Sequence, residues 1–359
     1  MEGTDALIIL LIIGTGFYLY SNDYFSGLAL PGASGGPLEG AATGSEYPGL
    51  LIKRFQPDQD TLRNGESTEF NLVVENTGGA KAENINAEFF RAGGLEIGSV
   101  NPAVLGSLLQ PDESTGTPGQ QREYAWKVTA PSVTGSVGYN PGVRIAYDYS
   151  SEGWSDLLAT KKEQAKVEAS MPSLRSGSTK APVTVSVITP NALLYEGAAG
   201  STVNIRVDVV NGASGIVYSE QGFGASDMNK IASLTIKVPS KYLKLDADVG
   251  NEVTGGSKTY WCCAKDCTDA NTAFDPEMKK ELSWVRSTDP DGNIILKKEA
   301  SDAFIGASLE LRRGLQKSFV CPFKVDQDAV GLEQIIPVQA SSSYTYAIEA
   351  ARQIVVVGS

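Results

Sequence analysis

Three of the four cysteines in this chain stand within six positions, at Cys262, Cys263 and Cys267, and the fourth is Cys321. Clustered thiols can bind zinc, exchange disulfides or form structural crosslinks. A four-thiolate zinc site needs two pairs of neighbouring cysteines, and Cys321 has no second cysteine beside it. A thioredoxin-like site needs two cysteines separated by two residues at the start of a helix, which this segment does not offer.

Structural disulfides are the interpretation that the cysteines favour, provided that the chain lies outside the cytoplasm. Cys262 and Cys263 are adjacent, and a bond between them would strain the intervening peptide. We therefore expect one of them to pair with Cys267 and the other with Cys321, and the sequence leaves open which. No metal and no cofactor is predicted.

The 359 residues include no histidine, and 42 acidic residues outnumber 30 basic ones, which gives a net charge of -12. Without histidine, the usual catalytic triads and histidine-rich zinc sites are excluded. The negative charge argues against a nucleic-acid partner. Paired carboxylates could hydrolyse glycosides, but no pair stands out. We therefore predict a non-enzymatic protein with no catalytic residues.

The N-terminal segment indicates the compartment. Residues 6–20 form an uncharged apolar run, and we predict a membrane helix within residues 1–29, with tyrosines at the interface. A cleaved secretory signal is the alternative, but the leader MEGTD carries two acids and no basic residue. Residues 30–49 are rich in Gly, Ala, Pro and Ser and predict a flexible tether. The rest is expected outside the cytoplasm, at the cell surface.

The remaining sequence contains two copies of one β-rich pattern. Ser67 begins STEFNLVVENTGG and Ser201 begins STVNIRVDVVNGASG. Both segments alternate apolar and polar residues and end in an Asn/Gly turn, as a half-buried strand does. Near the end of each copy a Y-x-Y-x-x-E pattern begins, at Tyr147 and at Tyr344.

Short alternating segments with frequent turns predict an all-β fold with two tandem immunoglobulin-like sandwiches. Cys321 aligns with Trp126, at an inward position. The second copy also gains a long insertion that contains the clustered cysteines. The predicted ranges are 50–172 for the first sandwich, 173–182 for a linker, 183–359 for the second sandwich and about 212–315 for the insertion.

The segment GESTEFNLVVENTGGAKAENINAEFF, residues 65–90, resembles the start of CARDB-type adhesion modules, which are common in archaeal cell-surface proteins. The resemblance covers about residues 50–170 and, more weakly, 183–357. It implies immunoglobulin-like domains with an adhesion role in an archaeal protein. The second copy departs from it at Val203 and Asn204 and through its insertion.

Two tryptophans, Trp154 and Trp261, lie in less regular stretches and are predicted to be exposed contact residues. The repeated tyrosines are instead predicted to serve the core or the structural corner of each sandwich. The segment DPDGN at Asp289 resembles the opening of a calcium loop but lacks the later glycine and glutamate, so a hairpin turn is favoured.

We therefore predict a surface protein that is held in the lipid bilayer by its N-terminal helix and binds an extracellular protein or glycan. Self-association is left open. The alternative is a subunit of a pilus-like or other surface filament, with the apolar helix in the filament core, because an apolar helix followed by a β-sandwich is similar to archaeal pilins. The leader MEGTD departs from that family, whose precursors carry a basic leader.

Overall fold

The computed structural model describes residues 49–161, 173–190, 193–195, 201–220, 225–248, 250–255, 258–263, 283–302 and 305–358. The predicted membrane helix at 1–29 and all of the predicted tether except Gly49 lie outside the described residues. Within the described ranges, no helix combines the length and the apolar character needed to cross a membrane. Residues 43–359 form one compact unit.

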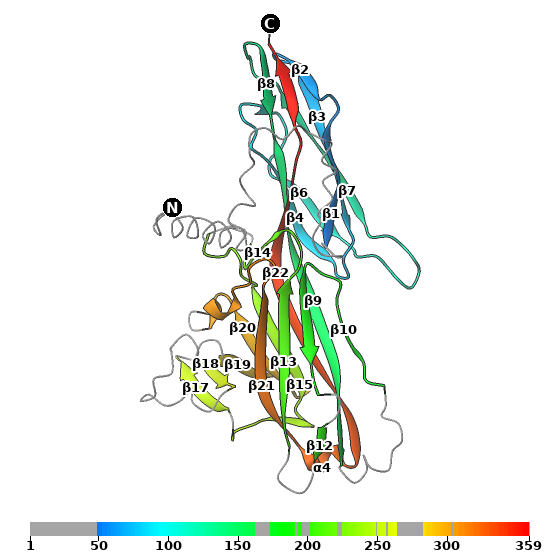
Figure 1. The fold of residues 1–359 in the computed structure, drawn as a ribbon, viewed down its shortest axis with the longest axis vertical. Helices are drawn as coiled ribbons and strands as arrows, with labels where there is room; N and C mark the ends of the chain where they lie inside the picture. The colour runs from blue at the N-terminus through cyan, green and yellow to red at the C-terminus, as the bar shows by residue number, and fades with distance from the viewer. Residues whose placement is uncertain are drawn as a thin grey trace, which may run out of the picture. The chain divides into compact units, whose positions relative to one another are not determined.

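This unit is built almost entirely of β-strands, as an all-β fold predicts (Figure 1). The first repeat contributes β1 (Leu50–Pro57), β2 (Thr61–Arg63), β3 (Ser67–Asn76), β4 (Ala82–Phe90), β5 (Glu96–Ile97), β6 (Ala103–Leu108), β7 (Gln121–Thr129), β8 (Ser136–Tyr139) and β9 (Gly142–Lys161). The second repeat contributes β10 (Ser176–Ser178), β11 (Val183–Ile188), β12 (Leu193–Tyr195), β13 (Thr202–Asn211), β14 (Ile216–Tyr218), β15 (Ser233–Pro239), β16 (Leu243–Leu245), β17 (Asn251–Gly255), β18 (Lys258–Cys262), β19 (Ser283–Thr288), β20 (Asn293–Glu299), the 3-10 helix η2 (Gly306–Leu309), β21 (Gln316–Val325), the helix α4 (Gln327–Val330), β22 (Glu333–Ala351) and β23 (Ile354–Val357).

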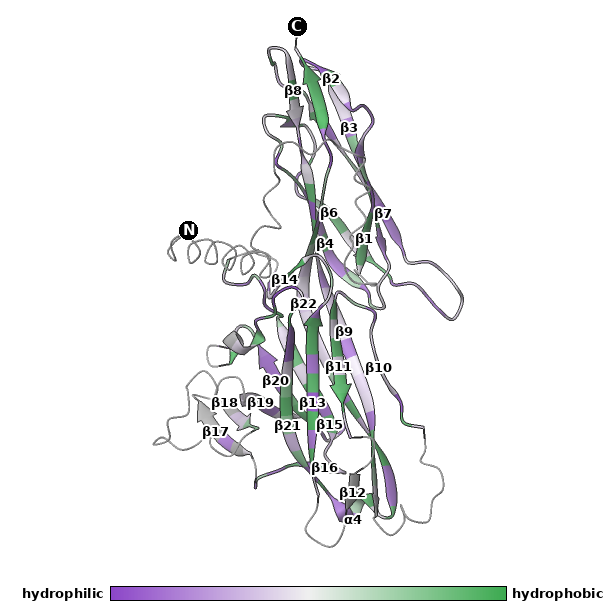
Figure 2. Cartoon of the chain, viewed as in Figure 1, coloured by the Kyte–Doolittle hydropathy of each residue, from purple (hydrophilic) through white to green (hydrophobic). Residues whose placement is uncertain are grey.

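Each repeat forms one four-stranded sheet, with the strand orders β1-β3-β7-β5 and β11-β13-β21-β16. This is the A-B-E-D order of an immunoglobulin sandwich. Phe70 lies opposite Trp126 in the first sheet, and Ile205 lies opposite Cys321 in the second; all four side chains are buried. The predicted equivalence of Trp126 and Cys321 is therefore confirmed. Figure 2 shows the underlying alternation of hydropathy along β13.

In the structure, Ser67 is equivalent to Thr202 and not to Ser201, so the two repeats align one residue away from the match of their Ser-Thr pairs. Val203 occupies the inward position that Thr68 occupies in the first repeat, because Thr68 lies opposite Val128 and Val203 lies opposite Phe323. In a strand, a shift of one residue moves every side chain to the other face, so burial decides the alignment more reliably than the Ser-Thr pair.

The second layer of both sandwiches is one continuous sheet, which contains the order β15-β22-β9-β4. Strands β9 and β22 run antiparallel and side by side over the whole length of β22, from the pair Gly142 and Ala351 to the pair Thr160 and Glu333 (Figure 1). The early part of β9 also pairs with β4 of its own repeat. The middle of β22 pairs with β15 of its own repeat. Each long strand therefore begins in its own sandwich and continues into the other one.

The C-terminal strand β23 departs from the predicted domain ranges of 50–172 and 183–359. The range 183–359 assigns Ile354–Val357 to the second sandwich, but β23 pairs with β2 in parallel and with β8 in antiparallel orientation (Figure 1). Both partners belong to the first repeat. The apolar run IVVV is typical of a strand, but it does not specify which sheet edge the strand joins.

The insertion is also shorter than the predicted range of about 212–315. Strand β15 pairs with β22 as β4 pairs with β9, and β20 pairs with β15 as β6 pairs with β4. These strands of the second repeat thus have counterparts in the first. Among the described residues, the added strands are β17, β18 and β19, which extend the shared sheet beyond β20.

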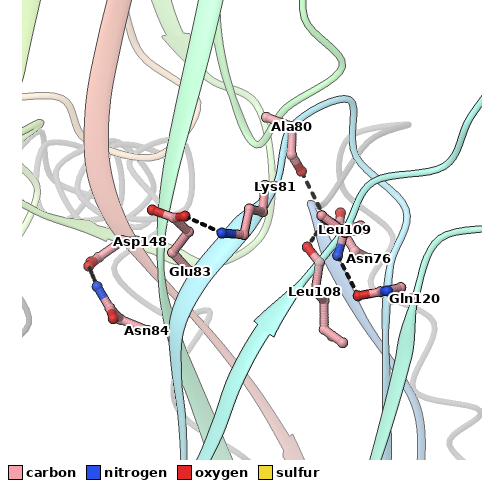
Figure 3. Close-up of polar contacts among 9 residues, drawn as sticks. All are labelled: Asn76, Ala80, Lys81, Glu83, Asn84, Leu108, Leu109, Gln120 and Asp148. Atoms are coloured by element: carbon pink, nitrogen blue, oxygen red, sulfur yellow. Dashed lines mark hydrogen bonds and ion pairs between the residues drawn. The ribbon is translucent and has the colours of Figure 1, made fainter.

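The predicted Asn/Gly turn after β3 is held by the buried side chain of Asn76. Its amide nitrogen donates to the carbonyl oxygens of Ala80 at 2.8 Å and Leu108 at 3.0 Å (Figure 3). A bulge follows in β4, where Asn84 has φ +50 and donates to the carboxylate of Asp148 at 2.8 Å. Asn76 therefore fixes the path by which the chain crosses from one sheet to the other.

The four repeated tyrosines lie together in the middle of the β9–β22 pair, where both strands pass from one sandwich into the other. Tyr147 lies opposite Tyr346 and Tyr149 lies opposite Tyr344, and neighbouring ring centroids are 5.7–6.3 Å apart. Exchanging the two repeats leaves this pairing unchanged, so the cluster lies on a quasi-two-fold axis. All four side chains are buried. The prediction of a core or corner role is confirmed.

Each tyrosine hydroxyl accepts a hydrogen bond from a backbone N–H of its own repeat. The donors and distances are Leu50 to Tyr147 at 3.2 Å, Ala80 to Tyr149 at 3.0 Å, Val183 to Tyr344 at 3.3 Å and Gly215 to Tyr346 at 2.8 Å. Burial raises the pKa of all four phenols, and the pKa of Tyr149 reaches about 12. The phenols therefore stay neutral and tie the first strand and the following turn of each repeat to the shared sheet.

Replacing Tyr346 with Phe tests this tie. The buried N–H of Gly215 would lose its acceptor, and we expect the free energy of unfolding to fall by about 1–3 kcal/mol. Urea denaturation measures the change. Tyr139→Phe is the control, because Tyr139 is only partly buried and packs against the core through its ring. Equal losses in the two variants would contradict the role of the hydroxyl.

Replacing Val356 with Asp tests the position of β23. Val356 is 0% exposed and Val357 is 40% exposed on the same strand, so Val357→Asp is the matched control. The buried charge should destabilise the fold and speed hydrogen exchange in β2 and β8. Faster exchange confined to β11 and β13 would instead place β23 in the second sandwich.

Candidate functional site

The two tryptophans predicted as contact residues differ in exposure. Trp154 on β9 is 41% exposed, as predicted, whereas Trp261 on β18 is 4% exposed. The prediction for Trp261 is therefore wrong. The physical reason is that Trp261 lies opposite the buried Trp284 in the hydrophobic core and that its ring packs against Gly250, where a Cβ would approach it to 2.7 Å.

Trp154 lines a groove of about 270 Å³ on the outer face of the shared sheet. The groove crosses β9, β22, β15 and β20, because Trp154 lies opposite Gln339, Gln339 opposite Lys237, and Lys237 opposite Ile295. The lining residues are Glu152, Gly153, Trp154, Thr235, Lys237, Ile295, Gln339, Ala340 and Ser341. The site combines one large aromatic side chain with several hydrogen-bonding groups, which is typical of a binding site.

The indole of Trp154 is held in place by the edge strand β10. Gly177 lies opposite Trp154, and a Cβ at residue 177 would approach the ring to 2.6 Å, so only glycine leaves room for it. β10 is itself fixed to β9 by the bond between Arg175 Nε and Asp156 Oδ2 at 3.0 Å. The aromatic wall of the groove is therefore preorganised.

The two charged side chains of the groove, Lys237 and Glu152, differ in their ion pairing. Lys237 is paired with Asp289 at 2.8 Å, and the hydrogen bonds from Lys237 and then Asn293 lower the pKa of Asp289 to about 2. Glu152 is exposed, and among the described residues its carboxylate has no ion pair and no hydrogen bond. The lysine charge is thus balanced inside the protein, while the Glu152 charge remains available to a ligand.

The DPDGN segment forms the predicted turn between β19 and β20. Gly292 N–H donates to the Asp289 carbonyl at 2.9 Å, and Asn293 N–H donates to the Asp289 carboxylate at 2.8 Å. The carboxylate oxygens therefore serve the hairpin and the ion pair with Lys237. Among the described residues, no group of three acidic, histidine or cysteine side chains is arranged to hold a metal ion.

A second and more open cavity lies beside the added strands, with Trp261 in its wall. Its basic residues are already paired, Arg286 with Glu252 at 2.6 Å and Lys244 with Asp326 at 2.5 Å. These ion pairs leave fewer groups for a ligand than the groove at Trp154.

Cys263 and Cys321 form a disulfide with a Cα–Cα distance of 4.9 Å, and both are buried. The bridge connects the residue after β18 with the inward position on β21, which confirms that the long crosslink ties the insertion to the sandwich. Cys262 is also disulfide-bonded, and Cys267 lies outside the described residues. A four-thiolate zinc site is contradicted, because a cystine offers no thiolates.

Lys298 is a buried cation that our sequence analysis missed. It is 0% exposed, its ammonium lies 4.9 Å from the centroid of the Trp284 ring, and it donates to Ser308 at 3.1 Å. The signal was available in the sequence, because alternation along β20 puts Lys298 on the same inward face as Ile294 and Leu296.

Neither the comparison with protein-family models nor the comparison with curated proteins finds a match. Among solved structures, the chain is similar to the secreted serine protease VesC from Vibrio cholerae, at 9% identity and a TM-score of 0.19. That match covers 85% of this chain and 51% of the protease, so the chain spans about half the length of that protein.

Two adhesins are also similar to this chain. The collagen adhesin CNA from S. aureus matches at 9% identity, with 86% of this chain and 92% of that chain covered and a TM-score of 0.13. The Enterococcus faecalis protein ACE matches at 7% identity, with 88% and 97% covered and a TM-score of 0.14. These TM-scores are too low to establish a common fold or role.

Removing the crosslink with Cys263→Ser and Cys321→Ser should destabilise the protein. The bridge closes a sequence separation of 58 residues, for which the loop-entropy model gives about 4 kcal/mol. Guanidinium denaturation without reductant measures the loss. As a control, a reducing agent should lower the denaturation midpoint of the double variant less than that of the unmodified protein. Equal midpoints for the two proteins without reductant would contradict the expected contribution of the disulfide.

Proposed function

We propose that the protein is a non-enzymatic surface protein that is anchored in a membrane by its N-terminal segment and acts outside the cytoplasm in adhesion or as a scaffold. The observation that carries this proposal is the buried Cys263–Cys321 disulfide. Disulfides of this kind persist in oxidising compartments and are rare in the cytosol.

The shared sheet supports a scaffold role. Two continuous strands join the sandwiches, in place of a flexible linker, so the joint is made of backbone hydrogen bonds along the whole of β22. Such a joint resists relative movement of the sandwiches. The groove at Trp154 adds a surface on which a protein or glycan partner can be held.

The CARDB resemblance, the archaeal source and the membrane anchor remain predictions from the sequence, and the absence of histidine supports the non-enzymatic assignment. The filament alternative differs in the fate of the N-terminus. N-terminal sequencing of the native protein distinguishes the two, because a processed terminus favours the filament subunit.

Surface labelling of intact cells tests the proposed location. A membrane-impermeant, lysine-reactive reagent should label the native protein without lysis, and non-reducing peptide mapping should recover Cys263 linked to Cys321. A cytoplasmic protein in the same cell suspension serves as the control and should be labelled only after lysis. Labelling only after lysis, together with free thiols at both positions, would overturn the proposal.

A further inference from the structure

The quasi-two-fold axis through the tyrosine cluster provides an internal comparison for the groove at Trp154. The same rotation that relates Tyr147 to Tyr344 relates Arg144 to Ser341 and Glu349 to Glu152. Both pairs lie opposite one another across β9 and β22: Arg144 opposite Glu349, and Ser341 opposite Glu152. The two sandwiches thus present the same backbone site with different side chains.

In the first sandwich, an arginine of the chain occupies this site. The guanidinium of Arg144 lies 2.7 Å from the Glu349 carboxylate and 3.8 Å from that of Glu88, and it stacks 5.1 Å from the centroid of the Phe90 ring. A cation on the outer face of the sheet therefore contacts both acidic side chains and an aromatic ring at this point.

In the second sandwich, the cation is missing from the equivalent position. Ser341 replaces the arginine, which leaves the Glu152 carboxylate without an ion pair among the described residues. The position of Phe90 is taken by Lys237, which is paired with Asp289. The aromatic side chain beside the site is instead Trp154, which lies two residues after Glu152 on β9 and is exposed. The hydroxyl groups of Thr235 and Ser341 and the amide oxygen of Gln339 can accept further hydrogen bonds.

We propose that this groove binds an arginine or lysine side chain of an extracellular protein partner, which takes the place that Arg144 fills in the first sandwich. This inference rests on the binding role proposed above and specifies the chemistry of the partner. The cation pairs with Glu152, contacts the face or edge of Trp154 and donates to the neighbouring oxygens. The net charge of -12 favours the approach of a basic partner.

Four variants that each raise the net charge by one unit test the proposal. Ser341→Arg supplies the missing arginine from within the chain, and Glu152→Gln removes the carboxylate. Val320→Arg and Glu123→Gln are the matched controls, because Val320 is 42% exposed on β21 of the opposite sheet and Glu123 is exposed on β7. General electrostatic attraction changes equally in all four variants.

The probe is an acetylated hexa-arginine peptide, and calorimetry on the full chain measures its dissociation constant. We expect the two groove variants to bind at least about tenfold more weakly than the unmodified protein, because one charge-assisted contact is lost. The two control variants should stay within about twofold. Urea denaturation checks that all four proteins are folded.

Equal binding by all four variants would overturn the proposal, since it would show attraction by overall charge alone. A panel of neutral hexoses provides the opposing test: sugar binding that Ser341→Arg abolishes, with peptide binding unaffected, would assign the groove to a glycan. Neither result changes the outcome of surface labelling, so failure of this inference is distinguishable from failure of the proposed location.

Discussion

The antiparallel pairing of β9 with β22, centred on four buried tyrosines, is the constraint on which the rest of this structure depends. A buried phenol needs a hydrogen-bond partner, and here each hydroxyl receives a backbone N–H from its own repeat. The rings pack on one another across the two repeats, while the hydroxyls reach back into each repeat. One cluster therefore fixes both the pairing of the sandwiches and the start of each one.

Because the central strands are shared, the two sandwiches do not have separate cores in the usual sense of tandem domains. β9 completes a layer of the second sandwich, and β22 leads through the first sandwich to β23, which joins β2 and β8. The contacts that complete the first sandwich come from residues more than 200 positions later in the chain. Contacts of such long sequence separation slow folding, since the whole chain must be present before they form.

Alternation predicted many of the inward positions in this arrangement, but it did not predict which strand edges pair, and the inward Lys298 of β20 was missed. Alternation identified the repeat, the inward positions of Trp126 and Cys321 and the burial of the tyrosines. It could not show that β23 joins the first repeat, because the apolar run IVVV can pair with an edge of either sandwich. Burial of Trp261 was missed because the added strands extend the shared sheet, and the open groove was missed because Ser341 is informative only beside Arg144.

The quasi-two-fold relation has a consequence for how such a protein can diversify. In a dimer of identical chains, the two-fold axis repeats every residue, so both copies of a surface site must be filled or both must be empty. Joining the two copies in one polypeptide removes that requirement while keeping the pairing that unites them. Arg144 and Ser341 can then differ, and a molecule built on symmetric principles acquires a single distinct face.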